Sequence, residues 1–473
     1  MILNGWIFKE TIPPLTAVEI PTGVGFCMYL RRDALDALDE FDEATFGRGY
    51  AEENDWCQRA VAGGWVNLHA LDVFVYHKGS VSFANEADER KQANLRRLEE
   101  RWPNYTGDVH GFIERDPARI WRTRALLALL RAEERPRVLA IAHGLGGGVR
   151  THMHELRRAR PDLCYLFLEP VDDGIVRLEL VPGEAECPTL DFRISQDYTD
   201  LVEILRAVGV AHLHWHHTMR VPTRLWGLAS DLGVSYDYTL HDFWVINANP
   251  TQTDNNGEFV GTGPDADERC ALAYPLPDGV TPQMWRQNQL VLMADARYLI
   301  CPSKDTLDRI RSCSEFAHLT QWVAAPHPDS AGLPAEVREP GLNGLLRVVA
   351  LGALSPEKGA DVLEQVAVEL KEAPVEFHLL GYAYRPLDEA VTVHGAYPES
   401  QVVERLLALE PDVVWLPARW PETYSYTLSA ALAAKLPVVA SAIGALPERL
   451  SGRWATALMP VDASYGDWAR FWR

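Results

Sequence analysis

The sequence has little of what marks secreted, membrane-spanning or nucleic-acid-binding proteins. Its seven cysteines are scattered over 473 residues without a C-x-x-C pair, a pattern typical of a reducing compartment. No run reaches the roughly 18 consecutive apolar residues that a membrane-spanning helix needs. Lys and Arg number 45 against 66 Asp and Glu, so the formal net charge is −21. This deficit of positive charge argues against a protein that coats nucleic acid.

Other sequence features set the broad class of the protein. The first ten residues, MILNGWIFKE, lack the pattern of a signal peptide. We therefore predict a cytoplasmic protein, and peripheral contact with the inner face of the membrane stays open. A length of 473 residues suits two to four domains, and 47% apolar residues can bury a large core. The negative charge does not exclude a phosphate-containing small ligand, because local amides and one or two lysines can bind it.

The chain divides into segments of different pattern. Residues 1–115 mix short strands, turns and an amphipathic helix at 86–102, and residues 116–136 are predicted to be a helical connector. From residue 137, short apolar runs alternate with helical segments, a pattern that predicts parallel strands buried on both faces. A segment rich in Pro and Gly, 327–344, separates two such blocks. We therefore predict an α/β fold with two doubly wound domains, 137–327 and 345–473, and a ligand cleft beyond the carboxyl ends of their strands.

A glycine-rich loop, GLGGG, lies between a predicted strand and a predicted helix at 144–148. Gly146, Gly147 and Gly148 would let the backbone approach a ligand closely, and the amides at a helix start attract anions. The dinucleotide pattern G-x-G-x-x-G is not met, because Val149 occupies its last position, so a dehydrogenase is disfavoured. A plain tight turn remains the alternative interpretation.

A second loop, GALSPEKG at 352–359, follows another predicted strand. Lys358 would lie near the start of the next helix, where an ammonium group can neutralise a diphosphate. A lysine exposed in a turn is the simpler interpretation of this motif by itself.

Histidines gather at a predicted strand, HLHWHH. His212, His214 and His216 would share one face of that strand, a spacing that could bind zinc in a metal-dependent hydrolase. The sequence offers no nearby Cys or carboxylate to complete the set, so we favour histidines that line a cleft. His241 and Asp242 follow the next strand, again at its carboxyl end.

The stretch PETYSYTLSAALAAKLPVVA at 421–440 predicts a loop with one acid, then a helix of small residues, then a strand. Glu422 lies at the end of the loop. Eight positions later, about two helical turns further on, stands Ala430. By itself, the stretch has two interpretations. It is a ligand site in which one acid of a pair is missing, or it is an ordinary α/β unit with a single glutamate.

Taken in order, GLGGGVRTHM, TLHDFW, ICPSKDT, LGALSPEKG, LLGY and the last stretch, extended to PETYSYTLSAALAAKLPVVASAIGALPE, resemble the GT-B glycosyltransferases of family four over residues 137–473. The resemblance implies retaining transfer of a sugar from a nucleotide-sugar, without an obligatory metal or other cofactor. By the same resemblance, the glycine loop closes over the donor phosphates, His241 lies beside the sugar, and Lys358 holds the diphosphate. It also implies that Glu422 contacts the sugar, and that the backbone around Tyr424, Ser425 and Tyr426 meets sugar and phosphate.

Two positions depart from that family. Ala353 stands where the family usually has an Arg after the glycine of the diphosphate loop, and Ala430 replaces the second Glu, which usually binds the ribose of the nucleotide. Each change removes a charge-assisted contact of about 1.5–3 kcal/mol. We expect weaker donor binding or other anchors.

In the first segment, Glu52, Glu53 and Asp55 lie within four residues before a helix, and His77 ends an apolar strand. A carboxylate cluster near a strand-end His suits a general base beside a metal. The alternative is an acidic helix start, which the helix dipole favours by itself.

This segment resembles the acceptor-side half of family-two GT-A glycosyltransferases, in particular rhamnosyltransferases of bacterial polysaccharide synthesis. The resemblance implies that Glu53 is the base with Asp55 in support, and that His77 can bind a divalent metal, Mg or Mn, in a complete module. The donor-binding half of such a module is missing, and the family-four part ends early, so we expect a fragment of a two-transferase protein.

We therefore predict a glycosyltransferase that moves a sugar from a nucleotide-sugar to a growing surface polysaccharide, such as lipopolysaccharide O-antigen. The predicted partners are the donor, for which dTDP-rhamnose and GDP-mannose both fit, and a glycan or lipid-linked glycan acceptor. The alternative is a non-catalytic scaffold that binds sugar nucleotides or glycans for a partner transferase.

Overall fold

The computed structural model describes residues 11–47, 51–75, 87–180, 189–330, 333–334, 336–337 and 344–473. The chain forms two compact units, Met1–Glu134 and Arg135–Arg473, and each is described here by itself. None of the helices in the described ranges is long and apolar enough to cross a membrane.

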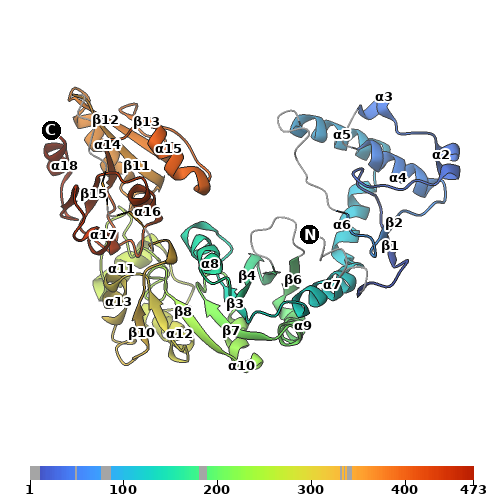
Figure 1. Ribbon diagram of the computed structural model, residues 1–473, viewed down its shortest axis with the longest axis horizontal. Coiled ribbons are helices and arrows are strands. Elements are labelled where there is room, and N and C mark those ends of the chain that lie inside the picture. Colours follow the sequence, from blue (N-terminus) through green and yellow to red (C-terminus); the bar gives the residue numbers. More distant parts are fainter. Residues whose placement is uncertain are drawn as a thin grey trace. The chain divides into compact units, whose positions relative to one another are not determined.

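The first unit is mainly helical (Figure 1). Its only described sheet is an antiparallel pair of short strands, β1 (Ala17–Glu19) and β2 (Leu68–Ala70). Its described helices are α2 (Arg32–Leu38), α3 (Glu43–Phe46), α4 (Glu52–Ala62), α5 (Ala87–Arg101), α6 (Tyr105–Arg115) and α7 (Arg119–Arg131). The predicted amphipathic helix is α5, and the predicted connector contains α7. Ala118 and Ala125 of that connector are buried against Ile12 and Leu71, so α7 packs on the first unit.

The second unit contains two sheets, and the first has eight strands in the order β10-β9-β8-β7-β3-β4-β5-β6. They are β3 (Arg137–Ile141), β4 (Cys164–Asp172), β5 (Ile175–Glu179), β6 (Thr189–Arg193), β7 (Val210–Trp215), β8 (Ser235–Thr239), β9 (Leu299–Cys301) and β10 (Trp322–Ala324). Six of them run parallel, from β10 to β4. The helices that accompany this sheet are α8 (Gly147–Ala159), α9 (Ile194–Ala207), α10 (Leu228–Leu232), α11 (Pro264–Ala273), α12 (Pro282–Ala294) and α13 (Lys304–Arg311), with 3-10 turns η1 (Thr223–Gly227) and η2 (Pro328–Ser330).

One edge of the first sheet differs from the predicted all-parallel pattern. Strands β5 and β6 are antiparallel to their neighbours. The chain turns back after β4 at Asp173 and Gly174, where Gly174 has φ +66°, a conformation that glycine adopts without strain. The alternating burial along β5 is that of a strand in an antiparallel edge, which the continuous apolar runs used for prediction do not capture.

The second sheet has six parallel strands in the order β13-β12-β11-β14-β15-β16. They are β11 (Leu346–Leu354), β12 (Val375–Ala383), β13 (Val391–Val393), β14 (Val413–Leu416), β15 (Val438–Ser441) and β16 (Thr456–Met459). The helices are α14 (Ala360–Glu369), α15 (Val402–Ala408), α16 (Tyr426–Ala433), α17 (Ala445–Leu450) and α18 (Tyr465–Trp472), with the 3-10 turn η3 (Glu399–Gln401). The predicted α/β fold with doubly wound sheets is confirmed.

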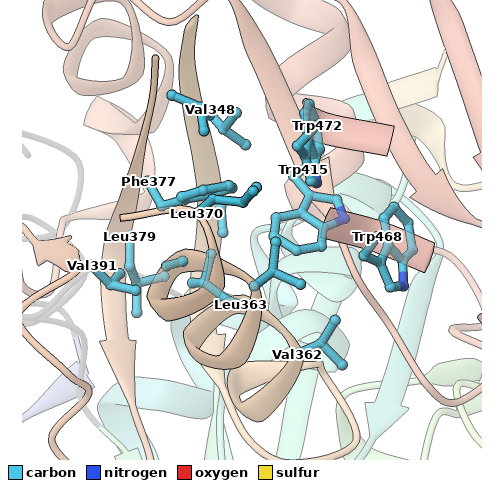
Figure 2. Close-up of a cluster of buried hydrophobic side chains, with 14 of the residues drawn as sticks. Val348, Val362, Leu363, Leu370, Phe377, Leu379, Val391, Trp415, Trp468 and Trp472 are labelled. Atoms are coloured by element: carbon cyan, nitrogen blue, oxygen red, sulfur yellow. The ribbon is translucent and has the colours of Figure 1, made fainter. Parts of the chain in front are cut away.

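An aromatic core fixes this second sheet (Figure 2). Trp415 of β14 is fully buried, and its ring centroid lies 5.1 Å from that of Trp468 and 5.3 Å from that of Trp472, both on α18. Phe377 of β12 completes the group at 5.8 Å from Trp415. Helix α18 begins with a capping box between Ser464 and Asp467, which holds the two tryptophans over the sheet.

Candidate functional site

A cavity of about 290 Å³ lies at the carboxyl ends of strands from both sheets of the second unit. Each sheet reverses its strand order at the cavity: β3 lies between β4 and β7, and β11 lies between β12 and β14. The loops that follow β11 and β14 line the cavity, together with the start of α8 and the residues after β8. Such switch points are the ligand-binding positions of doubly wound sheets.

Most of the predicted site residues of the second unit lie at this cavity. Its lining includes Gly148, His241, Lys358, Glu422, Tyr424, Ser425 and Tyr426. Gly146 and Gly147 are absent from the lining, but they form the turn that leads into α8. The structure therefore brings together residues that are nearly 280 positions apart in the sequence, and their roles stay predictions.

Helix α8 begins at Gly147, within the glycine loop and two residues earlier than predicted. Gly146 and Gly147 have φ of +72° and +65°, so both need the freedom of glycine. At Gly148, an added Cβ would lie 3.4 Å from the Tyr426 ring. The absence of a side chain at Gly148 therefore lets the backbone at the start of α8 pack closely against Tyr426, the first residue of α16.

The loop around Glu422 is held by backbone contacts. The Ala445 amide donates to the Glu422 carbonyl oxygen at 2.8 Å. A Cβ on Gly444 would come within 2.5 Å of that same oxygen, so only glycine allows α17 to start here. The Thr423 hydroxyl donates to the carbonyl oxygen of His241, which ties this loop to the end of β8. These contacts place Glu422 and His241 on neighbouring walls of the cavity.

Ser425, at the start of α16, has φ +77°, a strained conformation for a residue other than glycine. Arg449 of α17 compensates by donating to the carbonyl oxygens of Tyr424 at 2.9 Å and Ser425 at 2.7 Å. Its guanidinium also lies 3.9 Å from the centroid of the Tyr424 ring, and burial lowers its pKa. Sequence reasoning missed Arg449, because nothing in GALPERL indicates that a tertiary contact turns this side chain toward α16.

The two departures from the family pattern have different surroundings. Ala353 lines the cavity and is exposed, so the cavity wall has a methyl group where a guanidinium was expected. Ala430 is 6% exposed and is not part of the lining. Glu422 precedes α16 and Ala430 lies within it, so the two positions do not share one helix face.

Lys358 lies in the turn between β11 and α14, where its amide donates to the Ser355 carbonyl oxygen at 3.1 Å. Gly359 follows with φ +87°, and a Cβ there would come within 2.1 Å of the Pro417 carbonyl oxygen. Among the residues that the structure describes, the Lys358 ammonium has no hydrogen-bond or ion-pair partner. The cavity is therefore lined by a lysine whose ammonium group is not engaged by any other described residue.

The histidines of β7, and the two that follow it, pair with residues of the neighbouring strand β8 and of the loop after it. The pairs are His212 with Asp237 (3.0 Å), His214 with Thr239 (2.8 Å), His216 with His241 (3.1 Å) and His217 with Asp242 (3.0 Å). No carboxylate lies near these histidines in the sequence, but the parallel register of β7 and β8 brings Asp237 beside His212. His212 and His214 of the predicted zinc face are instead used for pairing between strands, whereas His216 lies just beyond the end of β7.

His143, which follows β3, is a buried titratable residue whose pKa makes stability depend on pH. It lowers the pKa of His143 to about 4, and the neighbouring His217 acts in the same direction. The unfolded chain binds a proton at this residue near pH 6.5, whereas the folded chain does so only near pH 4. Above pH 6.5 both states are neutral, so stability is lost as the pH falls from 6.5 to 4.

We expect His143→Asn to reduce the acid sensitivity of the protein. Between pH 7 and pH 5 the parent should lose about 2 kcal/mol more unfolding free energy than the variant. Urea unfolding at the two pH values measures this difference. His318→Asn, at an exposed position of the same sheet domain, is the control and should keep the parental pH dependence. Equal pH dependence in parent and His143→Asn would contradict the assignment.

In the first unit, Glu53 and Asp55 lie on α4 in different surroundings. Asp55 is fully buried, and it accepts hydrogen bonds from Arg59 (3.0 Å), Arg101 (2.9 Å) and the indole of Trp102 (2.9 Å). Both of its oxygens are therefore used in hydrogen bonds, and those from Arg101 and Trp102 connect α4 with the end of α5. Burial raises the pKa of Glu53, and within the described part of the chain its Oε2 has no hydrogen-bond partner. Glu53 therefore has the freer carboxylate of the two, and the predicted metal ligand His77 lies outside the described residues.

Comparison with known proteins gives a class for the second sheet domain. Residues 345–467 match the family model of glycosyl transferases group 1. No curated protein is similar enough to the sequence to match it. The family match confirms the predicted enzyme class, a glycosyltransferase, for this domain.

Among solved structures, HepE of Anabaena in complex with UDP and glucose is 13% identical and has a TM-score of 0.47, with 71% of this chain and 89% of that chain covered. Sucrose-phosphate synthase of Thermosynechococcus elongatus is 15% identical, with a TM-score of 0.45 and coverage of 71% and 88%. A glycosyltransferase of Rickettsia africae is 14% identical, with a TM-score of 0.45 and coverage of 72% and 87%.

Proposed function

We propose that residues 135–473 transfer a sugar from a nucleotide-sugar to a hydroxyl group of a glycan, with retention at the anomeric carbon. The observation that carries this proposal is the cavity between the two sheets, whose lining brings together Lys358, Glu422 and His241. The starts of α8 and α16 also face it, through Gly148 and Ser425. A positive side chain and two helix N-termini favour a diphosphate, and an acid beside them suits sugar hydroxyls.

The reaction needs stabilisation of the leaving group more than it needs a protein base. The bond between the anomeric carbon and the phosphate oxygen breaks, and a bond to the acceptor oxygen forms on the same face. The acceptor proton passes to the leaving diphosphate. Lys358 and the backbone amides at the helix starts offset the charge that grows on that diphosphate, and they are already in place before the reaction.

The remaining side chains orient the sugar in this proposal. Glu422 accepts hydrogen bonds from sugar hydroxyls, and its position is fixed through the contacts of Gly444 and Ala445. His241 lies beside the sugar on the neighbouring wall, which the Thr423 contact joins to the Glu422 loop. Tyr424 and Tyr426 contribute their backbone and close the cavity on the α16 side.

We further propose that the first unit is the acceptor-side part of an inverting, rhamnosyltransferase-like module. Glu53 is its best candidate base, because its carboxylate is half-buried and its pKa is raised by burial. Asp55 supports it by fixing α4. A divalent metal, Mg or Mn, would belong to a complete module of this kind. The acceptor would be a bacterial surface polysaccharide or its lipid-linked precursor. Peripheral association with the membrane would bring the protein close to such a precursor.

A thermal-shift screen tests the donor site directly. We expect at least one of UDP, GDP and dTDP, or its sugar conjugate, to raise the unfolding temperature of the full chain, because a ligand at 100 times its Kd stabilises by about 2.7 kcal/mol. Adenosine, which lacks the diphosphate, is the control and should have no effect. No stabilisation by any nucleotide diphosphate or nucleotide-sugar would contradict the proposal.

The second candidate function is a scaffold that binds a sugar nucleotide or glycan without turnover. Ala353 and Ala430 favour it, since each replaces a charged donor contact of the family pattern. The stabilising nucleotide-sugar identified in the screen separates the two functions. Slow release of free sugar from it supports a transferase, whereas tight binding by calorimetry without any hydrolysis or transfer supports the scaffold.

A further inference from the structure

Four histidines from distant parts of the chain meet beside the cavity. His152 comes from α8, His216 and His241 follow β7 and β8, and His327 follows β10. The His152 ring centroid lies 5.5 Å from that of His216, 5.0 Å from that of His241 and 3.9 Å from that of His327. Only His241 has a role in the proposed transfer, so the cluster needs another explanation.

The buried nitrogens of this cluster are not all paired. His152, His216 and His327 are 5%, 1% and 3% exposed. Among the described residues, His152 Nδ1, His216 Nε2 and His327 Nε2 have no hydrogen-bond partner. Burying an unpaired polar atom is unfavourable, and several such atoms in one cluster indicate a ligand for them.

The ring nitrogens have the spacing of a metal site. One ligand atom from each of His152, His216 and His241 lies within 4.8 Å of the others. His216 Nδ1 and His241 Nε2 are 3.1 Å apart. Two nitrogens on a tetrahedral zinc ion, each at about 2.0–2.1 Å from the metal, are about 3.3 Å apart. Small side-chain shifts would therefore allow these three imidazoles to share one ion.

A second set, His152, Glu155 and His327, also has ligand atoms within 4.8 Å. Its members are already engaged, because the Tyr426 hydroxyl lies 2.7 Å from Glu155 Oε2 and 3.0 Å from His327 Nδ1. Both sets need His152, so the two are alternatives. The set of three histidines includes the 3.1 Å contact between His216 and His241, and His152 and His216 each have one ring nitrogen without a partner among the described residues.

We propose that His152, His216 and His241 bind one divalent transition-metal ion, for which Zn²⁺ is the best match. Three imidazole ligands with one open position are a known zinc arrangement, and imidazole is a poor ligand for Mg²⁺ or Ca²⁺. The ion would fix α8 to the ends of β7 and β8. It would also hold His241, and so that wall of the cavity, in one orientation. This site does not depend on the proposed transferase activity.

Metal analysis of the full chain, produced without a histidine tag, tests the site. After chelator treatment and dialysis against Zn²⁺, we expect one zinc ion per chain. Substituting Co²⁺ should give the visible absorption of a tetrahedral nitrogen site. His152→Ala and His241→Ala should each weaken Zn²⁺ binding by about 100-fold or more in a competition titration with a chelating dye.

The matched control is His154→Ala, on the same helix two positions away. His154 packs against Phe167, with ring centroids 5.1 Å apart, and it is not part of the cluster. It should bind Zn²⁺ like the parent. Because the loss of a buried imidazole can prevent folding, circular dichroism accompanies each titration of His152→Ala, and the variant at the partly exposed His241, His241→Ala, provides the second test. Less than about half an ion per chain, or parental Zn²⁺ affinity in a folded His152→Ala or His241→Ala, would overturn the proposal.

Discussion

Replacing Lys358 with methionine is expected to lower the affinity of the protein for a nucleoside diphosphate by about 10- to 100-fold. Its ammonium lines the cavity without a partner in the described chain, so it is available to a phosphate. A hydrogen bond to a charged group contributes about 1.5–3 kcal/mol, which corresponds to this loss. Methionine keeps much of the length of the side chain and removes only the charge.

Two comparisons make the Lys358 result specific. Calorimetric titration with the diphosphate should show the loss, whereas affinity for the matching nucleoside, which has no phosphate, should stay the same. Lys371→Met is the control, since Lys371 pairs with Glu389 at 2.7 Å on the exposed surface of the same domain. A surface ion pair of this kind contributes about 0–1 kcal/mol, so the control should bind normally. Parental affinity in Lys358→Met would place the diphosphate elsewhere.

Replacing Trp415 with alanine is expected to destabilise the second sheet domain by about 3–5 kcal/mol. Trp415 is fully buried and lies within 6 Å, between ring centroids, of Trp468, Trp472 and Phe377. Alanine would leave a cavity that the surrounding rings cannot fill, because they are held by the strands and by α18. The urea midpoint of this domain should fall accordingly.

Two further variants separate the cavity effect from a general effect of losing a tryptophan. Trp415→Phe keeps a ring in the core and should lose clearly less stability than Trp415→Ala. Trp454→Ala removes a side chain that is 63% exposed, and its free energy of unfolding should stay within about 0.5 kcal/mol of the parent. If Trp415→Ala and Trp454→Ala had equal midpoints, the aromatic core would not be what stabilises this sheet.

The sequence by itself determined the α/β character of the second half. The apolar runs of β3, β11 and β14 are short and continuous, and helical segments alternate with them, so parallel sheets were predictable. Gly148, Lys358 and Glu422 could be selected as site residues for a related reason. They follow strands or precede helices, and the carboxyl ends of parallel strands meet at one edge of a sheet.

Pattern reasoning did not find the residues whose roles depend on contacts across the fold. Arg449 lies in an ordinary amphipathic segment, and its contact with the Ser425 carbonyl exists only because Gly444 brings α17 close to the loop. The carboxylate partner of His212 was missed because the sequence of neither strand determines the register in which β7 and β8 pair. Asp55 was grouped with Glu53 by spacing, yet the two carboxylates, only two positions apart on α4, differ: Asp55 is fully paired and Glu53 has one oxygen without a partner in the described chain.

The histidines show most clearly which features the sequence determines and which the tertiary structure determines. The sequence determined that His212, His214 and His216 alternate along one strand, because side chains in a strand have a period of two. Only the tertiary structure decided that His216 meets His241 from the next strand and His152 from α8, while His212 and His214 are used for strand pairing. A metal site needs three donors converging from different directions, and that convergence is a property of how strands and helices pack rather than of any local spacing.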